Sequence, residues 1–342
     1  MKNKILALLA TIGLASSVSA VEINKNLSIN GFIDGSWQDR SEDHTNAAAP
    51  HSNDSQDVSL DEVELNFLLN VGNVSGEIHL DNKDPFNGDI ENVNVEQAHF
   101  TYTLDNGLSI TFGRYGSKLG LEREDPAGLY TFSRAYGDGG AATASSAINY
   151  GDVDSLVREG VAFGYAAETF AINVSLDQTA GDNLKNAGEG INTEIAISYT
   201  GVDNLVANVG YRAEQVGGTN KDTDHINVNA TYTMGKALFA AEWQEASNDT
   251  VSAGTNGDNE AYQFLVDYDF NDKLGAAIRY SNEDQDADSR TGLEVSKFTI
   301  APNYAITDSL GLIVEYTTAD VDAPGAPSDD YDFIAAELTF TF

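Results

Sequence analysis

Strict alternation of apolar and polar side chains runs through His225-Ile-Asn-Val-Asn-Ala-Thr-Tyr-Thr-Met234. Successive side chains of an extended chain point to opposite faces, so this stretch predicts a β-strand with one apolar and one polar face. The same period of two runs through residues 62–71 and 191–200. Helical spacing of apolar residues appears nowhere over a useful length, and the sequence therefore predicts an all-β protein.

About sixteen such segments follow one another along the chain. Each is close to the length of about 9–11 residues that a tilted strand needs to cross a bilayer. The predicted strands span residues 27–38, 58–71, 74–82, 92–104, 107–115, 157–168, 169–178, 190–200, 204–215, 223–234, 236–247, 259–270, 273–284, 291–305, 309–319 and 330–342. Slips in the alternation near Glu96, Lys297 and Ala336 are interpreted as β-bulges.

Short and long connections alternate between these segments. Tight turns such as Gly72-Asn73, Gly235-Lys236 and Asn271-Asp272 suit hairpins. The long connections are rich in Asp, Asn, Gly and Ser and cover residues 39–57, 83–91, 116–156, 179–189, 216–222, 248–258, 285–290 and 320–329. This pattern predicts a transmembrane antiparallel up-and-down β-barrel of about 16 strands, with short turns at one end and long loops at the other. An even strand number puts both termini at the short-turn end, which we expect to be periplasmic.

The first twenty residues have the character of a secretory signal. Lysines in Met1-Lys-Asn-Lys4 precede an apolar stretch from Ile5 to Leu14, and the segment ends in Val18-Ser-Ala20. This order predicts cleavage after Ala20 and a mature domain of residues 21–342. A short buried helix of a cytosolic domain is the alternative interpretation. No later apolar run reaches the roughly 18 residues of a membrane helix, which excludes a helical membrane protein.

The charge is strongly acidic, because 18 Lys and Arg face 54 Asp and Glu and give a formal net charge of −36. Such a chain is poorly suited to neutralise phosphates, so a nucleic-acid partner is excluded. The absence of Cys removes disulfides, thiolate metal sites and cysteine nucleophiles. Acidic loops at 282–288 and 320–330 could bind Ca²⁺ or bridge divalent ions to lipopolysaccharide, but they lack the spacing of an EF-hand. We predict no cofactor, metal or catalytic residue.

The connection 116–156 is too long for an idle connector and is predicted to fold into the lumen. Its mixed charges would there create a local field that selects solutes. The alternative is an exposed surface flap. The candidate residues of the constriction are Arg114, Lys118, Glu122, Arg123, Glu124, Asp125 and Arg134. The candidate residues of the pore wall lie on polar strand faces and are Glu64, Glu77, Arg158, Glu194, Arg212, Glu242, Arg279 and Glu315.

The C-terminal strand ends on a stripe of Leu338, Phe340 and Phe342 in phase with its alternation. A terminal aromatic residue of this kind can close a barrel and lie in an interfacial girdle. We expect the barrel-assembly machinery to recognise this strand, which ends at Phe342.

Two segments resemble a known family: Leu108-Ser-Ile-Thr-Phe-Gly-Arg-Tyr-Gly-Ser-Lys-Leu-Gly-Leu-Glu122 and Tyr130-Thr-Phe-Ser-Arg134. Together with the signal, the strands and the terminal Phe342, they resemble the Gram-negative outer-membrane porin superfamily, and most closely the OmpL-like β-barrel porin group. The resemblance implies a water-filled pore for small hydrophilic solutes, narrowed by the third loop, in an outer membrane containing lipopolysaccharide. It leaves a homotrimer open.

The excess of acids on the polar strand faces predicts a lumen that prefers cations. One alternative function is an outer-membrane barrel enzyme of the lipase or protease type. It would need a nucleophile paired with a histidine, and no such pair stands out beside His79 or His99. The other alternative is a secreted soluble β-adhesin, which would partition into water rather than detergent.

Overall fold

The structure, a computed structural model, describes residues 20–44, 51–83, 93–122, 125–136, 157–179, 190–214, 222–249, 257–285, 292–322 and 329–342. The expected signal peptide lies outside the described residues except for Ala20, so its boundary stays a prediction. The same holds for Arg123 and Glu124 of the predicted constriction and for much of the long connections.

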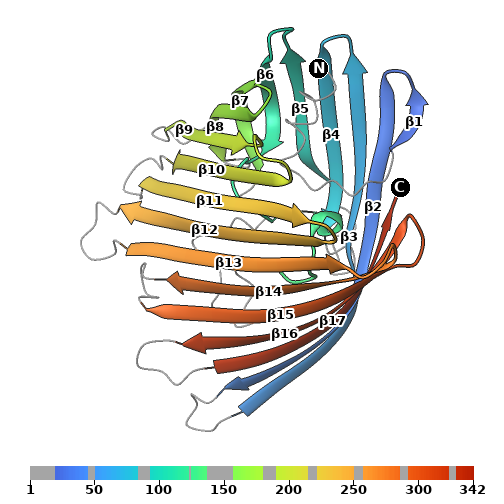
Figure 1. Ribbon diagram of the computed structural model, residues 1–342, viewed down its shortest axis with the longest axis vertical. Helices are drawn as coiled ribbons and strands as arrows, with labels where there is room; N and C mark the ends of the chain where they lie inside the picture. Colours follow the sequence, from blue (N-terminus) through green and yellow to red (C-terminus); the bar gives the residue numbers. More distant parts are fainter. Residues whose placement is uncertain are drawn as a thin grey trace.

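The described residues form one antiparallel barrel in which sixteen strands, β2 to β17, each pair with their neighbours along the chain (Figure 1). The bounds of the first strands are β1 (Val21–Asn24), β2 (Leu27–His44), β3 (His51–Val71), β4 (Val74–Lys83), β5 (Asn94–Thr103), β6 (Leu108–Gly116), β7 (Val157–Ala166), β8 (Phe170–Thr179) and β9 (Asn192–Tyr199). The remaining strands are β10 (Leu205–Glu214), β11 (Asp222–Met234), β12 (Ala237–Asp249), β13 (Gly257–Asp269), β14 (Leu274–Gln285), β15 (Leu293–Ala305), β16 (Leu310–Asp322) and β17 (Asp329–Thr341). The predicted all-β barrel of about 16 strands is confirmed.

In the described part of the chain, one short strand and one helical turn accompany these sixteen strands. Strand β1 folds back on the start of β2 as a hairpin, so it adds no further wall to the barrel. The helical turn is η1 (Pro126–Gly128), which belongs to the third loop. In the part of the chain that the structure describes, no helix is long and apolar enough to cross a membrane.

The barrel closes between β17 and β2, where Phe340 lies opposite Ile33. At the very end of the chain, the backbone N–H of Phe342 donates to the carbonyl oxygen of Gly31, and the N–H of Gly31 donates back, each over 3.1 Å. A Cβ atom on Gly31 would lie 2.2 Å from the carbonyl oxygen of Glu64. The close approach of β2 to β3 beside the closing contact therefore requires glycine at this position.

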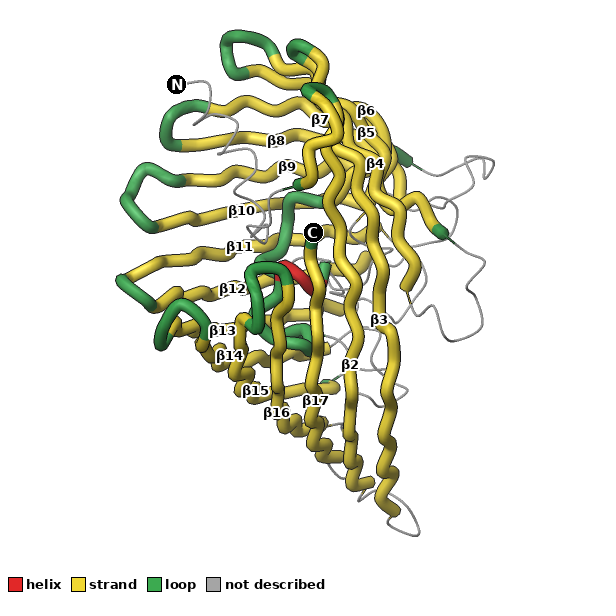
Figure 2. The backbone as a smooth tube through the Cα atoms, turned by 90° about the vertical axis from the view of Figure 1, so that its right-hand side faces the viewer, coloured by secondary structure: helices red, strands yellow, loops and turns green. Residues whose placement is uncertain are grey.

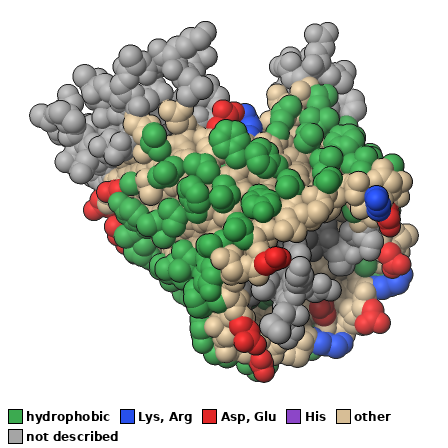
Figure 3. Space-filling view, turned by 90° about the horizontal axis from the view of Figure 1, so that it is seen from above, with side chains coloured by type: hydrophobic (Ala, Val, Ile, Leu, Met, Phe, Trp, Pro, Cys, Tyr) green, Lys and Arg blue, Asp and Glu red, His purple; other side chains and the backbone are tan. Residues whose placement is uncertain are grey.

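The alternation sorts side chains between the outside of the barrel and its lumen. On β11, Val228 is 44% exposed on the outer face, whereas its neighbour Asn227 is 1% exposed on the inner face. The same division recurs around the barrel, and hydrophobic side chains gather over its outer surface (Figure 3). An apolar exterior around a polar interior is the arrangement of a barrel that faces lipid.

Exposed aromatic side chains form two belts on the outer face. One belt lies at the short-turn end and includes Tyr102, Phe170, Tyr199, Tyr232, Tyr268, Tyr304 and Phe340. The other lies toward the long connections and includes Trp37, Tyr211, Tyr280 and Tyr316. Aromatic rings with a polar tip favour the two membrane–water interfaces, so the belts mark the limits of the apolar band.

The first long connection is shorter than predicted. The sequence predicts a loop at residues 39–57, but β2 and β3 continue as a paired hairpin to His44 and His51. Polar side chains bond across this extension, with Ser41 Oγ donating to Asp54 and Gln56 Nε2 donating to Asp39, both over 2.9 Å. Because this part of the hairpin has no apolar face, its strands leave no alternating signal in the sequence.

The predicted bulges are confirmed at one position and wrong at two. Glu96 is an extra residue in β5, since Val95 lies opposite Leu80 and Gln97 lies opposite His79. Pairing is regular through Lys297 and through Ala336. The slips there have another cause: an apolar cluster faces the lumen on these strands, formed by Leu293, Val295, Ala319, Val321, Tyr331, Phe333 and Ala335. An unpredicted bulge lies in β3, between the partners of Asp34 and Gly35.

The lipid-facing assignment of β11 leads to a first prediction. Val228→Arg places a charge between the two aromatic belts, at a cost of about 2–4 kcal/mol near mid-bilayer. We expect it to lower the yield of folded barrel in lipid vesicles, measured as the heat-modifiable band on a gel. Thr231→Arg, on the lumen-facing side of the same strand, is the control and should fold with a much higher yield. Equal yields for the two variants would contradict the assignment.

The closing contact leads to a second prediction. Deleting Phe342 removes both backbone hydrogen bonds to Gly31 and the ring that packs beside Phe340, at 5.9 Å between centroids. We expect slower appearance of the folded, heat-resistant form in cells and accumulation of protein in the periplasm. Phe342→Tyr keeps the backbone and the ring and should fold at the normal rate. A normal rate for the deletion would show that the last residue has no part in closure.

Candidate functional site

The third loop, residues 117–156, connects β6 to β7 and is described at 117–122 and 125–136. Its described parts lie inside the barrel, with η1 beside β17 (Figure 2). The predicted folding of this loop into the lumen is therefore confirmed. A loop in this position must find hydrogen-bond partners for its backbone on the barrel wall.

The loop begins on the carboxylate of Glu194, a lumen-facing residue of β9. Glu194 accepts hydrogen bonds from the Ser117 hydroxyl at 2.7 Å and from the Lys118 backbone N–H at 2.8 Å. Leu119 then packs against Gly210, where a Cβ would lie 2.7 Å from the Leu119 Cγ. Glycine at residue 210 thus leaves room for the loop.

A buried group of charges holds Glu194 in place. Arg212 is fully buried and pairs with Asp177 at 2.7 Å, Glu214 at 2.6 Å and Glu194 at 3.5 Å. Arg158 joins the group through Glu214, at 3.5 Å. Because these charges pair with one another away from water, they act first as a scaffold for the start of the loop.

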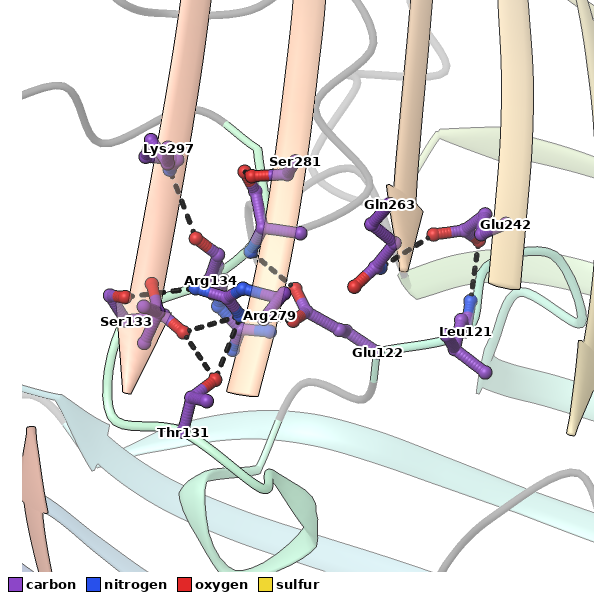
Figure 4. A network of polar contacts seen from close by, with 12 residues as sticks. Leu121, Glu122, Thr131, Ser133, Arg134, Glu242, Gln263, Arg279, Ser281 and Lys297 are labelled. Carbon is purple, nitrogen blue, oxygen red and sulfur yellow. Dashed lines mark hydrogen bonds and ion pairs between the residues drawn. The ribbon is translucent and has the colours of Figure 1, made fainter. Parts of the chain in front are cut away.

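The second anchor is Glu242 on β12, which is buried beneath the loop. It accepts hydrogen bonds from the Leu121 backbone N–H at 2.7 Å and from the side-chain amides of Asn227 and Gln263, each at 2.8 Å (Figure 4). Three donors satisfy this carboxylate, and no cation among the described residues forms a salt bridge with it. Such saturation lets a charged group stay buried at the wall.

The third anchor is Arg279 on β14, whose side chain is fully buried between wall and loop. Its guanidinium donates to Glu122 at 2.6 Å, to the Thr131 hydroxyl at 2.8 Å and to the Ser133 carbonyl at 2.8 Å (Figure 4). A further bond of 2.9 Å reaches the Ser133 hydroxyl. Glu122 also accepts from the Ala135 backbone N–H at 2.8 Å. Arg279 and Glu122 together tie both described parts of the loop to one strand.

Three further wall residues hold the loop near residues 133–135. Glu315 on β16 accepts from the Ser133 backbone N–H, with the shorter distance 3.1 Å. Lys297 on β15 donates to the Arg134 carbonyl at 2.9 Å, and Ser281 on β14 donates to the Ala135 carbonyl at 2.7 Å. Acidic side chains of the wall thus accept hydrogen bonds from backbone N–H groups of the loop, and donors on the wall form hydrogen bonds with its carbonyl oxygens.

Small wall residues make space for the side chains of the loop. Leu119 and Tyr136 pack into a buried cluster with Ala135 and with the wall residues Ala196, Ala246 and Ala261. Burial raises the pKa of the Tyr136 hydroxyl well above its usual value, so this residue stays protonated and neutral. The loop is therefore held by apolar packing as well as by the polar anchors.

The structure brings most of the predicted constriction residues into the lumen. Lys118, Glu122, Asp125 and Arg134 belong to the described parts of the folded-in loop. Arg114 does not, because it lies on the same outward side of β6 as Phe112 and pairs with Glu159 at 3.6 Å. This placement corrects the prediction for Arg114. Arg123 and Glu124 lie outside the described residues.

All of the predicted wall residues lie on lumen-facing positions, but many of them contact the loop or one another. Glu194, Glu242, Arg279 and Glu315 hold the loop, while Arg158 and Arg212 pair with acids. The sequence missed Lys297 as an anchor because its alternation was interpreted as a bulge.

A separate acidic region lies on β3 to β5 and includes Asp125 of the third loop. Glu62, Glu64 and Asp125 place carboxylate oxygens within 4.8 Å of one another, and so do Glu62, Asp81 and Glu96. His79 joins this region, 3.1 Å from Glu64 and 3.3 Å from Glu77. Glu64, His79 and Glu96 form a third group whose ligand atoms lie within 4.8 Å of one another. Hard cations prefer the carboxylate oxygens of these groups as ligands. The side chain of Glu77 is 42% exposed, so it meets the lumen water.

Comparisons with known proteins agree with this architecture. A profile of the Gram-negative porin family matches residues 6–324. No curated protein matches the sequence significantly. Among solved structures, the chain is similar to the outer membrane channel DcaP of Acinetobacter baumannii, with 15% identity, a TM-score of 0.65, and coverage of 95% of this chain and 100% of that one.

Two further structures share the fold. Salmonella typhi OmpF in complex with daunomycin has 16% identity and a TM-score of 0.63, over 95% of this chain and 100% of that chain. The trimer form of OmpT from Vibrio cholerae has 13% identity and a TM-score of 0.63, over 93% and 100% of the two chains. At these identities the likeness establishes the fold alone.

The anchoring role of Arg279 leads to a third prediction. Arg279→Met leaves Glu122 without its cation, a loss of about 3–5 kcal/mol for a buried pair. We expect the Ser133 and Ala135 amides to exchange hydrogen at least about a hundredfold faster, measured by mass spectrometry on the folded barrel. Lys236→Met, in a short turn, is the control and should leave this exchange unchanged. Unaltered exchange in Arg279→Met would refute the anchoring role.

Proposed function

This chain belongs to the Gram-negative porin family, and we propose that it is a passive diffusion channel for small hydrophilic solutes and ions that prefers cations. The main support is the third loop inside the closed barrel, clamped at Glu194, Glu242, Arg279 and Glu315. Such clamps keep a narrow passage open at a fixed width. A polar lumen wall of this kind would hold water along the path.

The proposed cation preference rests on how the charges are distributed. Arg212 and Arg279 are fully buried and paired with acids, so their fields are largely compensated within the wall. The acidic region on β3 to β5 borders the lumen. Glu77 lies beside His79 in this region, and its side chain is 42% exposed. The imidazole rings of His79 and His99 lie 3.3 Å and 3.8 Å from the Glu77 carboxylate. Only charges within about 8–10 Å of the path act on solutes at physiological salt.

The proposal extends to placement and assembly. The family and the fold indicate the outer membrane. We infer that residues 1–20 are removed, that both termini face the periplasm and that the long connections meet lipopolysaccharide. The strand that ends at Phe342 would be recognised by the barrel-assembly machinery. A homotrimer is proposed by analogy with the trimer form of OmpT.

Family and fold point to a channel rather than an enzyme. The described contacts of His79 agree with this choice, because its ring nitrogens face the carboxylates of Glu64 and Glu77. A hydrolase of the serine type needs a hydroxyl at that distance.

A planar-bilayer recording in a KCl gradient tests both parts of the proposal. We expect stepwise ion currents whose reversal potential is displaced from zero toward the equilibrium potential of potassium. Glu77→Gln should move this potential toward that of chloride, because it removes a carboxylate from the water-filled path. Glu168→Gln, an exposed acid in a short turn, is the matched control and should change it little. Absence of conductance would refute the channel, and equal shifts for the two variants would refute the role of Glu77.

A further inference from the structure

A second lumen feature lies toward the long connections, between the third loop and strands β2, β16 and β17. It is a pocket of about 270 Å³ whose lining includes Arg40, Phe132, Arg134, Thr317, Tyr331 and Phe333. Resting on the proposed function, we propose that this pocket is a binding subsite for small carboxylates that carry a planar ring. Such solutes would pause here on their way through the channel.

The apolar half of the pocket is built from aromatic side chains that face inward. Phe132 of the loop stacks on Phe333 of β17, with ring centroids 5.7 Å apart and an interplanar angle of 21°. Phe333 and Tyr331 are 4% and 6% exposed, although they lie on the lumen side of the strand. Phe132 and Arg40 cover the Phe333 ring, whereas Phe132 itself is only half-buried and leaves part of its ring at the pocket. A planar ring is the complementary shape.

The polar half of the pocket includes two arginine residues. Arg40 lies directly opposite Phe333 in the pairing of β2 with β17, and its Cζ atom is 5.5 Å from the centre of that ring. Among the described residues, Arg40 makes no ion pair. Arg134 lines the same pocket from the loop. A guanidinium above an aromatic ring offers its N–H groups at the edge of the ring, where a carboxylate attached to a planar ligand would lie.

The size and the charge of the pocket limit its ligand. Its volume is slightly below the roughly 300–1,000 Å³ of pockets for drug-sized ligands, which suits an acid with a single ring. Asp61 borders the pocket and would repel a carboxylate from that side, which directs the anionic group toward Arg40. In a lumen that is otherwise acidic, this pair of arginines creates a local site where an anion is favoured.

The test uses benzoate as the probe and compares it with acetate, which lacks the ring, and benzamide, which lacks the charge. Full-length channels are recorded in planar bilayers, and binding to the detergent-solubilised barrel is measured by titration calorimetry. We expect benzoate to reduce the KCl current in a saturable manner and to bind at least about tenfold more tightly than either analogue. Binding of benzoate no tighter than acetate or benzamide would overturn the proposal.

Variants locate the effect. Arg40→Gln should weaken benzoate binding about tenfold, the loss expected for one charge-assisted hydrogen bond. Phe132→Leu should weaken benzoate binding but leave the weak binding of acetate unchanged. Lys273→Gln is the matched control, since Lys273 also lies over a ring, that of Tyr304 at 6.0 Å, but in a short turn. An Arg40→Gln barrel that folds, as judged by heat-modifiable mobility, and keeps full benzoate affinity would refute the site.

The two measurements separate this inference from the function on which it rests. A wild-type barrel that conducts ions but binds benzoate no better than acetate supports the channel and refutes the pocket. Specific calorimetric binding without any conductance supports the pocket and refutes the channel.

Discussion

The structure depends on one requirement: a loop that enters a barrel must satisfy its backbone hydrogen-bonding groups there. Glu194, Glu242 and Glu315 accept N–H groups of the third loop, and Arg279 and Lys297 reach its carbonyls. A neutral amide or hydroxyl would form weaker bonds, because charged acceptors and donors bind about twice as strongly. The wall charges therefore hold the loop, and a loop held at several strands keeps a fixed passage.

This use of charge changes how the lumen is understood. Most ionised wall groups near the loop are compensated by a partner, as Arg212 is by Asp177 and Glu194. The carboxylate of Glu77 differs from these groups because its side chain is 42% exposed to water, and under the proposed function it acts on passing ions. On this proposal, the scaffold and the selectivity rest on different residues, although all of them lie on the same polar faces of the strands. Local position, rather than residue type, separates the two roles.

The wall also departs from a simple division into apolar outside and polar inside. Around Phe333, strands β15 to β17 are apolar on both faces, since Ile334 faces outward while Phe333 and Ala335 face the lumen. The loop residue Phe132 covers part of this inner surface. The apolar lumen cluster gives the loop a second kind of attachment and leaves a recess beside Arg40. Docking of the loop and formation of the recess are therefore one event.

Alternation in sequences such as 225–234 determined the strands, their number, the lipid face and the barrel, because period two directly reflects the pleat. It failed for the polar hairpin extension near Ser41, where neither face is apolar, and at Lys297, where the inner face is unexpectedly apolar. The entry of the third loop into the lumen was predictable from its length and mixed charge. Only the tertiary structure decided that Glu122 meets Arg279, 157 residues away, and that Arg114 faces outward. Contacts between distant strands depend on closure and register, which no local pattern encodes.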